Sequence, residues 1–479
     1  MIGTIEFPGL LSLALAVNYL LAAVFIVRIL MSYRTAQGAI AWIVSLALMP
    51  FVPLIVYALF GRNRLMGYMR ARRAGDEEVN QLVERLHRRE GPALGPPPPH
   101  CPELRVLTEL VRLPFVTGNH CQLLIKGDAI FNALFEALES ARDYILLDFY
   151  LVRSDRFGQQ IKSALKAKLS EGVRVYFVYD EIGSVGLSRR YIRELTRAGA
   201  EVVPFGSANG RRRRFEINFR NHRKLLICDG RVGFLGGINL GDEYIGNPNS
   251  FGPWRDTHCR IEGNAVMAMQ LAFVEDWYWA TNEVPELHWQ PTASTRADQS
   301  VLILPTGPAD DFETCTLFFL NAINNARERI WIATPYFVPD LQIMNALQLA
   351  SLRGVDVRVV IPKNPDHKVV RLAAFSYLAQ AERAGISLYH YRPGFMHQKA
   401  LLVDDRYAAI GTANLDNRSM RLNFEVMAVV ADDAFVSDVE TMLIDDMAKC
   451  DRLGVQDYRS RNPLFRIASR TARLLAPLL

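Results

Sequence analysis

Two long uncharged stretches open the chain. Residues 9–27 and residues 36–60 contain no Asp, Glu, Lys or Arg and are rich in apolar side chains. A helix needs about 20 apolar residues to cross the bilayer core, so both stretches are long enough to span a membrane. Pro50 and Pro53 interrupt the second stretch, and proline kinks or ends a helix. The pattern therefore predicts a two-helix membrane anchor over residues 1–61, with its second helix kinked or folded back as a pair of helices.

The residues around these stretches predict how the anchor is oriented. No basic segment precedes the first stretch and no small-residue cleavage site follows it, which argues against a removable signal peptide. Five arginines lie within residues 62–73, whereas the short connection holds only Arg28 and Arg34. Positively charged loops tend to stay in the cytoplasm. We therefore expect a multi-pass protein of the inner (cytoplasmic) cell membrane, with residues 62–479 on the cytoplasmic face.

A basic and proline-rich linker, residues 62–100, separates the anchor from the rest of the chain. It ends in GPALGPPPPH, and four consecutive prolines form a stiff, extended spacer. We expect no packed structure in residues 91–100 and a soluble body that begins near Cys101.

The body repeats its own pattern. The segments ARDYILLDFYLVRSD, EGVRVYFVYD and AGAEVVPF of the first half correspond to ARERIWIATPYFVPD, RGVDVRVVIP and AGISLYHY of the second. Each pair combines an amphipathic helical stretch with a short apolar run, which is typical of an α/β fold with buried strands. We expect two related α/β/α halves, residues 101–290 and 291–479, with the active site at their interface.

Charge and cysteine usage narrow the class of protein. The net charge is +5, and Arg clusters such as residues 211–214 form either a basic surface that attracts phosphate groups or an ordinary solvated surface. The six cysteines are far apart and form no C-x-x-C pair. They are predicted to be free thiols in a reducing compartment, with no metal site and no cofactor.

One polar motif occurs twice in the body. The pattern H-x-K-x-x-x-x-D, followed by G-x-x-N, appears in both halves with every position offset by 175 residues, which argues against chance. Residues two apart in a strand point to the same face, so the His and Lys of each copy project together. The Asp is interpreted as a structural residue where the strand ends, and the Gly as room for a ligand. The residues are His222, Lys224, Asp229, Gly236 and Asn239, and then His397, Lys399, Asp404, Gly411 and Asn414.

The doubled motif resembles the phospholipase D superfamily, whose members carry two copies of it. The resemblance covers residues 100–479 and implies two duplicated phospholipase D-like halves. The segments TPYFVPD, GTANLDNRSMRLNFEV and WRDTHCRIEG, together with the two hydrophobic N-terminal stretches, look like the bacterial cardiolipin synthase branch of this superfamily.

The motif residues suit displacement at a phosphodiester. The two lysines can neutralise its negative charge, and the two asparagines can donate amide hydrogen bonds to it, so no metal is required. Two histidines suit a covalent path, in which one attacks phosphorus and the other protonates the departing alcohol. The resemblance implies His222 as the nucleophile and His397 as the general acid/base. The symmetry of the two copies leaves the opposite assignment open.

Two acidic residues outside the motif are candidates for orienting the histidines. A neutral attacking imidazole needs an acceptor on its far nitrogen. Asp256 follows His222 in WRDTH, and Glu425 follows His397 in LNFEV. We predict that each carboxylate orients the histidine of its own half. The alternative is that each caps a turn or pairs with a nearby Arg.

The resemblance implies phosphatidylglycerol as donor and acceptor, cardiolipin and glycerol as products, and anionic membrane lipids as partners. Hydrolysis of phospholipid to phosphatidate, and a synthase that uses phosphatidylethanolamine, stay open as alternatives. The two hydrophobic stretches argue against a nuclease, so no nucleic acid partner is expected. The intact histidines and lysines argue against a silent membrane scaffold. A homo-oligomer is a further hypothesis.

The C-terminal tail, residues 461–479, alternates Leu and Ile with Arg. Such a basic amphipathic helix can lie on an anionic leaflet, although an ordinary surface helix has the same pattern. Tyr150 and Tyr336 are interpreted either as core aromatics or as residues that line the entrance to the site.

Overall fold

The computed structural model describes residues 7–32, 36–60, 68, 94–208, 211–212, 218–245 and 252–478. Apart from Tyr68, the basic segment 62–73 lies outside the described residues, as do two of the four arginines of residues 211–214. The predicted orientation of the anchor depends on that basic segment and therefore stays a prediction.

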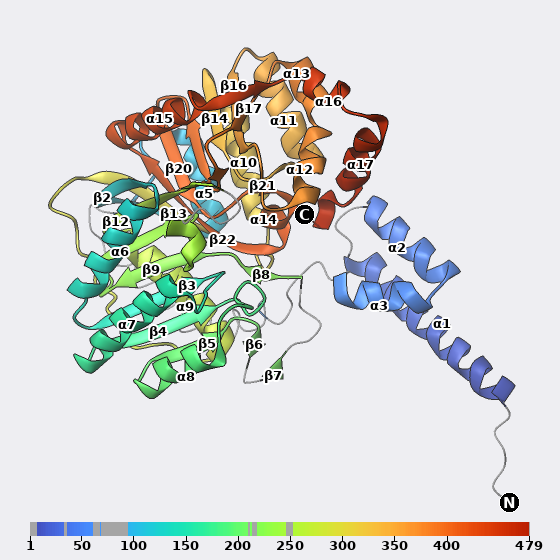
Figure 1. Ribbon diagram of the computed structural model, residues 1–479, viewed down its shortest axis with the longest axis horizontal. Helices are drawn as coiled ribbons and strands as arrows, with labels where there is room; N and C mark the ends of the chain where they lie inside the picture. The colour runs from blue at the N-terminus through green and yellow to red at the C-terminus, as the bar shows by residue number, and fades with distance from the viewer. Residues whose placement is uncertain are drawn as a thin grey trace, which may run out of the picture.

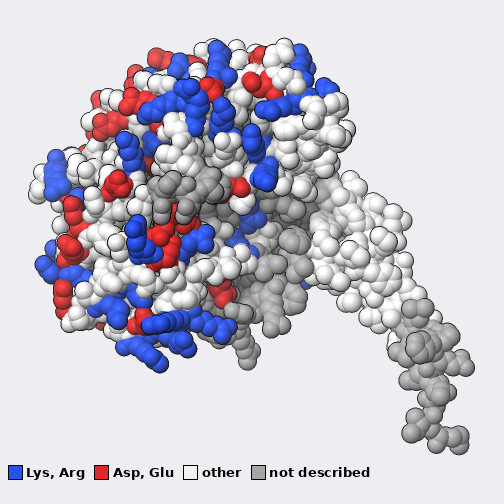
Figure 2. All heavy atoms as spheres, viewed as in Figure 1, with Lys and Arg blue, Asp and Glu red and all other residues white. Residues whose placement is uncertain are grey.

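Three helices form the N-terminal region, α1 (Phe7–Ser32), α2 (Ala36–Leu48) and α3 (Phe51–Phe60). By length and composition one described helix could cross a membrane, over Ser12–Met31 with a mean hydropathy of 2.3. The second hydrophobic stretch is not one helix, because α2 ends before Pro50 and α3 begins after it. The tyrosine of α3, Tyr57, packs against Phe25 and Trp42. Figure 1 shows this region projecting from the body, and its visible face carries no charged side chains in Figure 2.

The linker is partly packed, which corrects the expectation of a bare spacer. Leu94 and Gly95 form β1 and pair with Val116 and Phe115 at the start of β2 (Phe115–Ile125). Further upstream, Tyr68 is buried in the body. The folded body therefore includes residues on the N-terminal side of the proline run.

The body is built on one sheet of 17 described strands, in which the two halves repeat the same order. From its outer edge inward the first half runs β5-β4-β3-β9-β10-β12-β2, and the second half runs β17-β16-β14-β19-β20-β22-β13. The strands of the first half are β2, β3 (Tyr144–Phe149), β4 (Arg174–Tyr179), β5 (Glu201–Pro204), β9 (Lys224–Cys228), β10 (Val232–Gly236) and β12 (Thr257–Gly263). Those of the second are β13 (Gln299–Thr306), β14 (Arg329–Ala333), β16 (Asp356–Pro362), β17 (Ser387–Tyr391), β19 (Ala400–Val403), β20 (Tyr407–Gly411) and β22 (Asn423–Ala431), with β23 (Cys450–Leu453) added outside β17.

The halves meet where β2 pairs with β13 (Figure 1). The inner strands are buried on both faces, as β3 and β22 show along their whole length, which explains their nearly unbroken apolar sequences. Helices cover both faces of the sheet. The main ones are α6 (Gly127–Ser140), α7 (Arg156–Ser170), α8 (Arg189–Arg197), α9 (Val266–Thr281), α10 (Thr314–Asn325), α11 (Leu341–Leu352), α12 (Lys368–Phe375), α13 (Leu378–Ala384) and α15 (Asp433–Met447).

The predicted mixed α/β fold with an internal duplication is confirmed. The six cysteines are free thiols, as the sequence predicted, and five of them are buried. With no bridge to hold it, the body depends on the packing of its sheet and helices.

The tail forms the helix α17 (Pro463–Leu474), which packs on α12. Its buried positions carry small residues, Ser469 and Ala472, and Phe465 packs on Phe375, whereas its other large apolar side chains point outward. Leu464, Ile467 and Leu474 are 76%, 62% and 79% exposed. A helix that packs only against a protein core normally shows the reverse arrangement.

Candidate active site

Each motif histidine follows a short strand that pairs with the other half of the molecule. The strand β8 (Arg220–Asn221) runs parallel to the start of β22, and the backbone N–H of His222 donates to the carbonyl of Phe424 at 2.9 Å. The strand β18 (Phe395–Met396) runs parallel to β11 (Trp254–Arg255), and His397 donates to the carbonyl of Arg255 at 2.8 Å. The duplicated halves thus exchange equivalent backbone contacts at the two motifs.

The carboxylates are exchanged in the same way, so each histidine contacts the acidic residue of the other half. This corrects the predicted pairing within each half. His222 Nδ1 lies 2.8 Å from Glu425 Oε2, and His397 Nδ1 lies 2.9 Å from Asp256 Oδ2. Glu425 follows the segment that pairs with β8, and Asp256 follows the segment that pairs with β18, so each carboxylate arrives beside the opposite histidine. Each of the two predicted carboxylates therefore contacts the motif histidine of the opposite half, and the predicted pairing is wrong.

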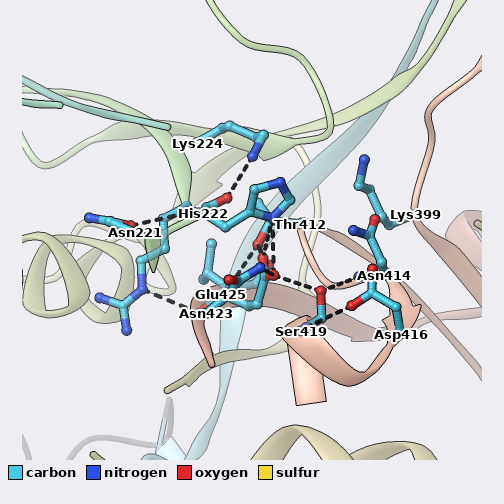
Figure 3. Close-up of polar contacts among 12 residues, drawn as sticks. Asn221, His222, Lys224, Lys399, Thr412, Asn414, Asp416, Ser419, Asn423 and Glu425 are labelled. Atoms are coloured by element: carbon cyan, nitrogen blue, oxygen red, sulfur yellow. Dashed lines mark hydrogen bonds and ion pairs between the residues drawn. The ribbon is translucent and has the colours of Figure 1, made fainter. Parts of the chain in front are cut away.

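Glu425 is held by several other side chains (Figure 3). It accepts hydrogen bonds from Thr412 Oγ1 at 2.6 Å, Ser419 Oγ at 2.7 Å and Asn423 Nδ2 at 3.1 Å. Asp256 accepts from the backbone N–H of its neighbour Thr257 at 2.8 Å. A carboxylate fixed in this way fixes in turn the ring that it contacts. The Nε2 atom of His222 is left for chemistry, whereas that of His397 lies 2.9 Å from Lys399 Nζ.

The two motif lysines lie on either side of the imidazole of His222 (Figure 3). Each Nζ donates to the carbonyl of its own histidine at 2.6 Å, and both side chains are buried. Burial lowers the pKa of Lys224 to about 7 and that of Lys399 to about 8. Two buried amines with weakened basicity favour an anion between them, because an anion stabilises their charged form.

The two histidines differ in the acidity of the carboxylate that contacts them. Burial, reinforced by the motif lysines, lowers the pKa of both His222 and His397. Burial raises the pKa of Glu425 to about 7. Burial alone would also raise the pKa of Asp256, but the hydrogen bond from His397 holds it well below its usual range. Asp256 is therefore a full anion that favours the protonated form of His397, whereas His222 faces the weaker acid.

The asparagines of the motif have structural contacts of their own. Asn239 donates to Tyr244 Oη at 2.8 Å and accepts from the backbone N–H of Leu151 at 3.2 Å. The backbone of Asn414 donates to Ser419 Oγ at 3.0 Å. Within the described residues the amide oxygen of Asn414 is buried without a partner. Donation from either amide to a phosphodiester stays a prediction.

The aspartates of the motif close equivalent turns, as predicted. Asp229 and Asp404 have φ angles of 54° and 52°, in the left-handed region that Asp tolerates better than most residues. Asp229 accepts from three successive backbone N–H groups at the start of β3, and Asp404 accepts from three at the start of β14. These bonds join the end of each motif strand to its neighbouring strand.

The glycines that follow the motif aspartates make room for protein atoms. A Cβ on Gly236 would overlap the carbonyl of Thr257, and one on Gly411 would overlap the carbonyl of Val426. The expectation that these glycines admit a ligand is therefore replaced by a packing role beside β12 and β22.

Comparison with known proteins decides the family. The family described as "Cardiolipin synthase, PLD-like domain" matches residues 134–249 and 319–447. The chain is 43% identical over 475 residues to cardiolipin synthase A of Pseudomonas fluorescens SBW25, covering 98% of this chain and 99% of that protein. It is 44% identical over 474 residues to cardiolipin synthase A of Pseudomonas aeruginosa LESB58, covering 98% and 96%. The chain belongs to the cardiolipin synthase family.

A solved structure supports the fold of this cardiolipin synthase family member. The phosphatidylserine synthase of Haemophilus influenzae Rd KW20 superposes with a TM-score of 0.61 at 15% identity, covering 79% of this chain and all of that one. At this identity the likeness concerns the fold alone.

In this family member the sequence reasoning missed a buried polar network behind the first motif. Asp276 of α9 accepts from Arg223 Nη1 at 2.8 Å, from Asn221 Nδ2 at 3.1 Å and from Tyr68 Oη at 3.1 Å. Asn221 also donates to Asp148. The sequence did contain one signal for this network. Asn221 and Arg223 flank His222 next to an apolar strand, and such residues are rarely buried without partners.

The two tyrosines singled out in the sequence differ in surroundings. The ring of Tyr150 lies 5.0 Å from the ring of His222, and Lys224 Nζ lies 5.3 Å from the ring of Tyr150. Tyr336 instead donates to Asp366 at 2.8 Å. Tyr150 is therefore the one that contacts the motif residues.

Proposed function

We propose that this chain is a cardiolipin synthase, which transfers a phosphatidyl group from one phosphatidylglycerol to another through a phosphohistidine. One observation carries the proposal. Two histidines, each held through Nδ1 by a carboxylate of the other half, lie beside two buried lysines. The lysines provide positive charge for one phosphodiester, and the histidines provide a nucleophile and a proton carrier.

In the first step His222 Nε2 attacks phosphorus. The P–N bond forms, the P–O bond to the glycerol headgroup breaks, and His397 gives its Nε2 proton to the departing glycerol oxygen. The contact with Asp256 favours the imidazolium that His397 needs for this step. This is the physical reason to assign the nucleophile to His222 and the acid to His397. Lys224 and Lys399 hold the phosphoryl oxygens throughout.

In the second step the hydroxyl oxygen of another phosphatidylglycerol attacks the same phosphorus. Its proton passes to His397 Nε2, the P–N bond breaks, and His222 is restored. One phosphodiester replaces another, so the exchange needs no nucleotide. If water reaches the intermediate first, the product is phosphatidate, and exclusion of water therefore separates the synthase from a hydrolase.

The membrane setting fits lipid substrates. The helix α1 is long and apolar enough to span a bilayer, and most of its large side chains are exposed. The outward apolar face of α17, flanked by Arg466 and Arg470, suits contact with an anionic leaflet. We propose that the body lies on the cytoplasmic face of the inner membrane, as the arginines of residues 62–73 indicate.

The test uses the purified full-length protein in phosphatidylglycerol vesicles, without added metal or nucleotide. We expect cardiolipin and glycerol in equal amounts, and no product from the His222→Ala variant. A brief reaction with donor lipid labelled in its phosphate, quenched in denaturing detergent at alkaline pH because the P–N bond is acid-labile, should trap label on the wild-type protein but not on His222→Ala. Phosphatidate without cardiolipin would identify a hydrolase, and label retained on His222→Ala would reverse the histidine roles.

A further inference from the structure

The second motif histidine is lined by aromatic rings. The ring of Trp254 lies 5.3 Å from the ring of His397, and those of Phe395 and Tyr244 lie 5.7 Å and 6.5 Å from it. The rings also contact one another, because Trp254 lies 4.7 Å from Phe395 and 4.5 Å from Tyr244. Phe395 and Tyr244 are buried, whereas Trp254 is partly exposed. His397 therefore lies against an aromatic wall, which consists of Tyr244, Trp254 and Phe395.

The duplication places polar residues at the equivalent positions beside the other histidine. Through the offset of 175 residues and the strand register, Tyr244, Trp254 and Phe395 correspond to Ser419, Asn423 and Arg220. Ser419 and Asn423 donate to Glu425, the carboxylate that contacts His222 (Figure 3). The duplicated fold therefore does not itself require an aromatic wall, which is a feature of the His397 side.

Two hydrogen bonds fix the wall beside the histidine. Trp254 Nε1 donates to Asp256 Oδ2 at 3.3 Å, and the same oxygen contacts His397 Nδ1. Asn239 Nδ2 donates to Tyr244 Oη at 2.8 Å. With these polar edges held by the protein, the ring faces present carbon atoms. Such a surface packs favourably on a carbon chain and gives an ordered water few partners.

This surface lies where the second step of the reaction chooses its attacking molecule. An alcohol that attacks the phosphohistidine forms a new P–O bond, the P–N bond to His222 breaks, and the proton of the hydroxyl passes to His397. Water reacts by the same sequence and yields phosphatidate. The alcohol differs from water in its carbon chain, so an apolar surface next to the proton acceptor can separate the two.

We propose that Trp254 determines the choice of acceptor, because the aromatic wall packs against the carbon chain of the attacking glycerol headgroup and excludes water from His397. This rests on the proposed function, which supplies the phosphohistidine and the second phosphatidylglycerol. The glycerol that departs in the first step leaves from the place that the acceptor then takes, so one wall serves both. Trp254 is a specificity-determining residue, and the chemical steps stay with the motif residues.

The test compares two products of one intermediate. Full-length protein acts on phosphatidylglycerol vesicles, and phosphatidate and cardiolipin are measured in the same sample. We expect Trp254→Ala to raise the ratio of phosphatidate to cardiolipin about ten-fold or more, as the loss of apolar contacts in a pocket does elsewhere. Trp254→Phe keeps an aromatic ring without the N–H group and should raise the ratio about two-fold at most. Trp289→Ala is the matched control, because Trp289 is partly buried and packs on the core. It should leave the ratio unchanged.

Three results would overturn the proposal. An unchanged ratio in Trp254→Ala, with a wild-type protein that forms cardiolipin, would exclude the aromatic subsite and leave the proposed function standing. A rise in Trp254→Phe as large as in Trp254→Ala would assign the effect to the hydrogen bond with Asp256. An equal rise in Trp289→Ala would assign it to general loss of packing. If the wild-type protein forms only phosphatidate, the proposed function itself fails. A partly unfolded variant lowers both products together and leaves the ratio readable.

Discussion

At the scale of single residues, the asymmetry of the site comes from the choice of Asp behind one histidine and Glu behind the other. Asp256 stays ionised against His397, whereas burial raises the pKa of Glu425 to about 7. A general acid gains from a fixed anion, because the anion stabilises the imidazolium. A nucleophile needs only the correct tautomer, which a weaker acceptor also provides. The two duplicated halves therefore differ chemically in the carboxylate that each provides to a histidine.

Neutral replacements of the two carboxylates should have unequal effects. We expect Asp256→Asn to lower kcat by about two to four orders of magnitude, because His397 loses the charge that holds its proton. Glu425→Gln should cost about ten- to hundred-fold, since the amide oxygen can still accept from His222. Initial rates on phosphatidylglycerol vesicles measure both. Equal losses, or a greater loss for Glu425→Gln, would contradict the assigned roles.

The buried lysines predict a pH dependence. Their active form is protonated, and burial lowers their pKa values to about 7 and about 8. The free enzyme therefore loses these charges as the pH rises through that range, and kcat/KM should fall there. A bound phosphodiester stabilises the charged amines, so kcat should fall only at higher pH. The charge of Glu425 raises the pKa of both lysines, so Glu425→Gln should move this alkaline limb to lower pH, whereas the limb would vanish if Glu425 were its source. A kcat/KM that is constant up to pH 9 would contradict this account.

Much of the site was predictable from the sequence at this scale. The doubled motif identified the histidines, lysines and turn aspartates, because spacing along one strand fixes which side chains share a face. The assignment of Glu425 to His222 was not predictable in the same way. It depends on pairing between short strands of different halves, and one sequence holds no signal for such long-range contacts.

At the scale of elements, the two-residue strand β8 ties the motif to three distant parts of the chain. Asn221 and Arg223 on either side of His222 donate to Asp276, and Arg223 Nε donates to the carbonyl of Glu425 at 3.2 Å. Tyr68, from the linker, completes this network and packs on Phe424. The segment next to the membrane anchor thereby contributes to the support of the catalytic strand.

Substitution of Tyr68 should show this support. Tyr68→Phe removes one hydrogen bond to Asp276 and should lower the free energy of unfolding by about 1 kcal/mol. Tyr68→Ala also removes the buried ring and should cost about 3–5 kcal/mol. Thermal unfolding of the detergent-purified protein measures both. Tyr458→Phe is the control, because its hydroxyl makes only a 3.4 Å contact near the surface. No difference between Tyr68→Phe and Tyr458→Phe would show that the linker tyrosine adds no specific support.

The linker also marks a limit of sequence interpretation. A proline run predicts a spacer on composition alone, yet Leu94 and Gly95 add a strand beside β2. Proline disfavours central strands but tolerates an edge position. The composition of residues 91–100 predicted a stiff, extended segment and did not reveal the strand that it meets.

At the scale of the whole molecule, the exposed apolar surfaces of the anchor and of the tail both suit contact with a membrane. The exposed leucines of α1 suit a bilayer interior, and the outward face of α17 suits a bilayer surface.

The duplicated fold was predictable, because repeated strand and helix patterns fix the architecture of each half. The pairing of β2 with β13, which joins the halves, was not predictable. Several strands of each half are equally apolar and offer the same kind of edge.

Polar substitutions on α17 should impair work at the membrane without unfolding the body. We expect the triple variant Leu464→Gln, Ile467→Gln and Leu474→Gln to lower activity on vesicles several-fold, with an unchanged thermal midpoint and unchanged activity on short-chain soluble phosphatidylglycerol. The matched control replaces the exposed leucines of α11, Leu341, Leu349 and Leu352, by Gln. An equal loss in the control would mean that α17 has no special contact with lipid.

The crossed carboxylates have a consequence for the growing chain. While a ribosome has made only the first half, His222 has no acceptor for its Nδ1 proton, because Glu425 does not yet exist. The second half brings the missing carboxylate and receives Asp256 in return. Neither histidine is oriented until both halves have folded together. A nascent or truncated chain next to the membrane therefore cannot cut the lipids around it, and the protein begins to act on its bilayer only once it is complete.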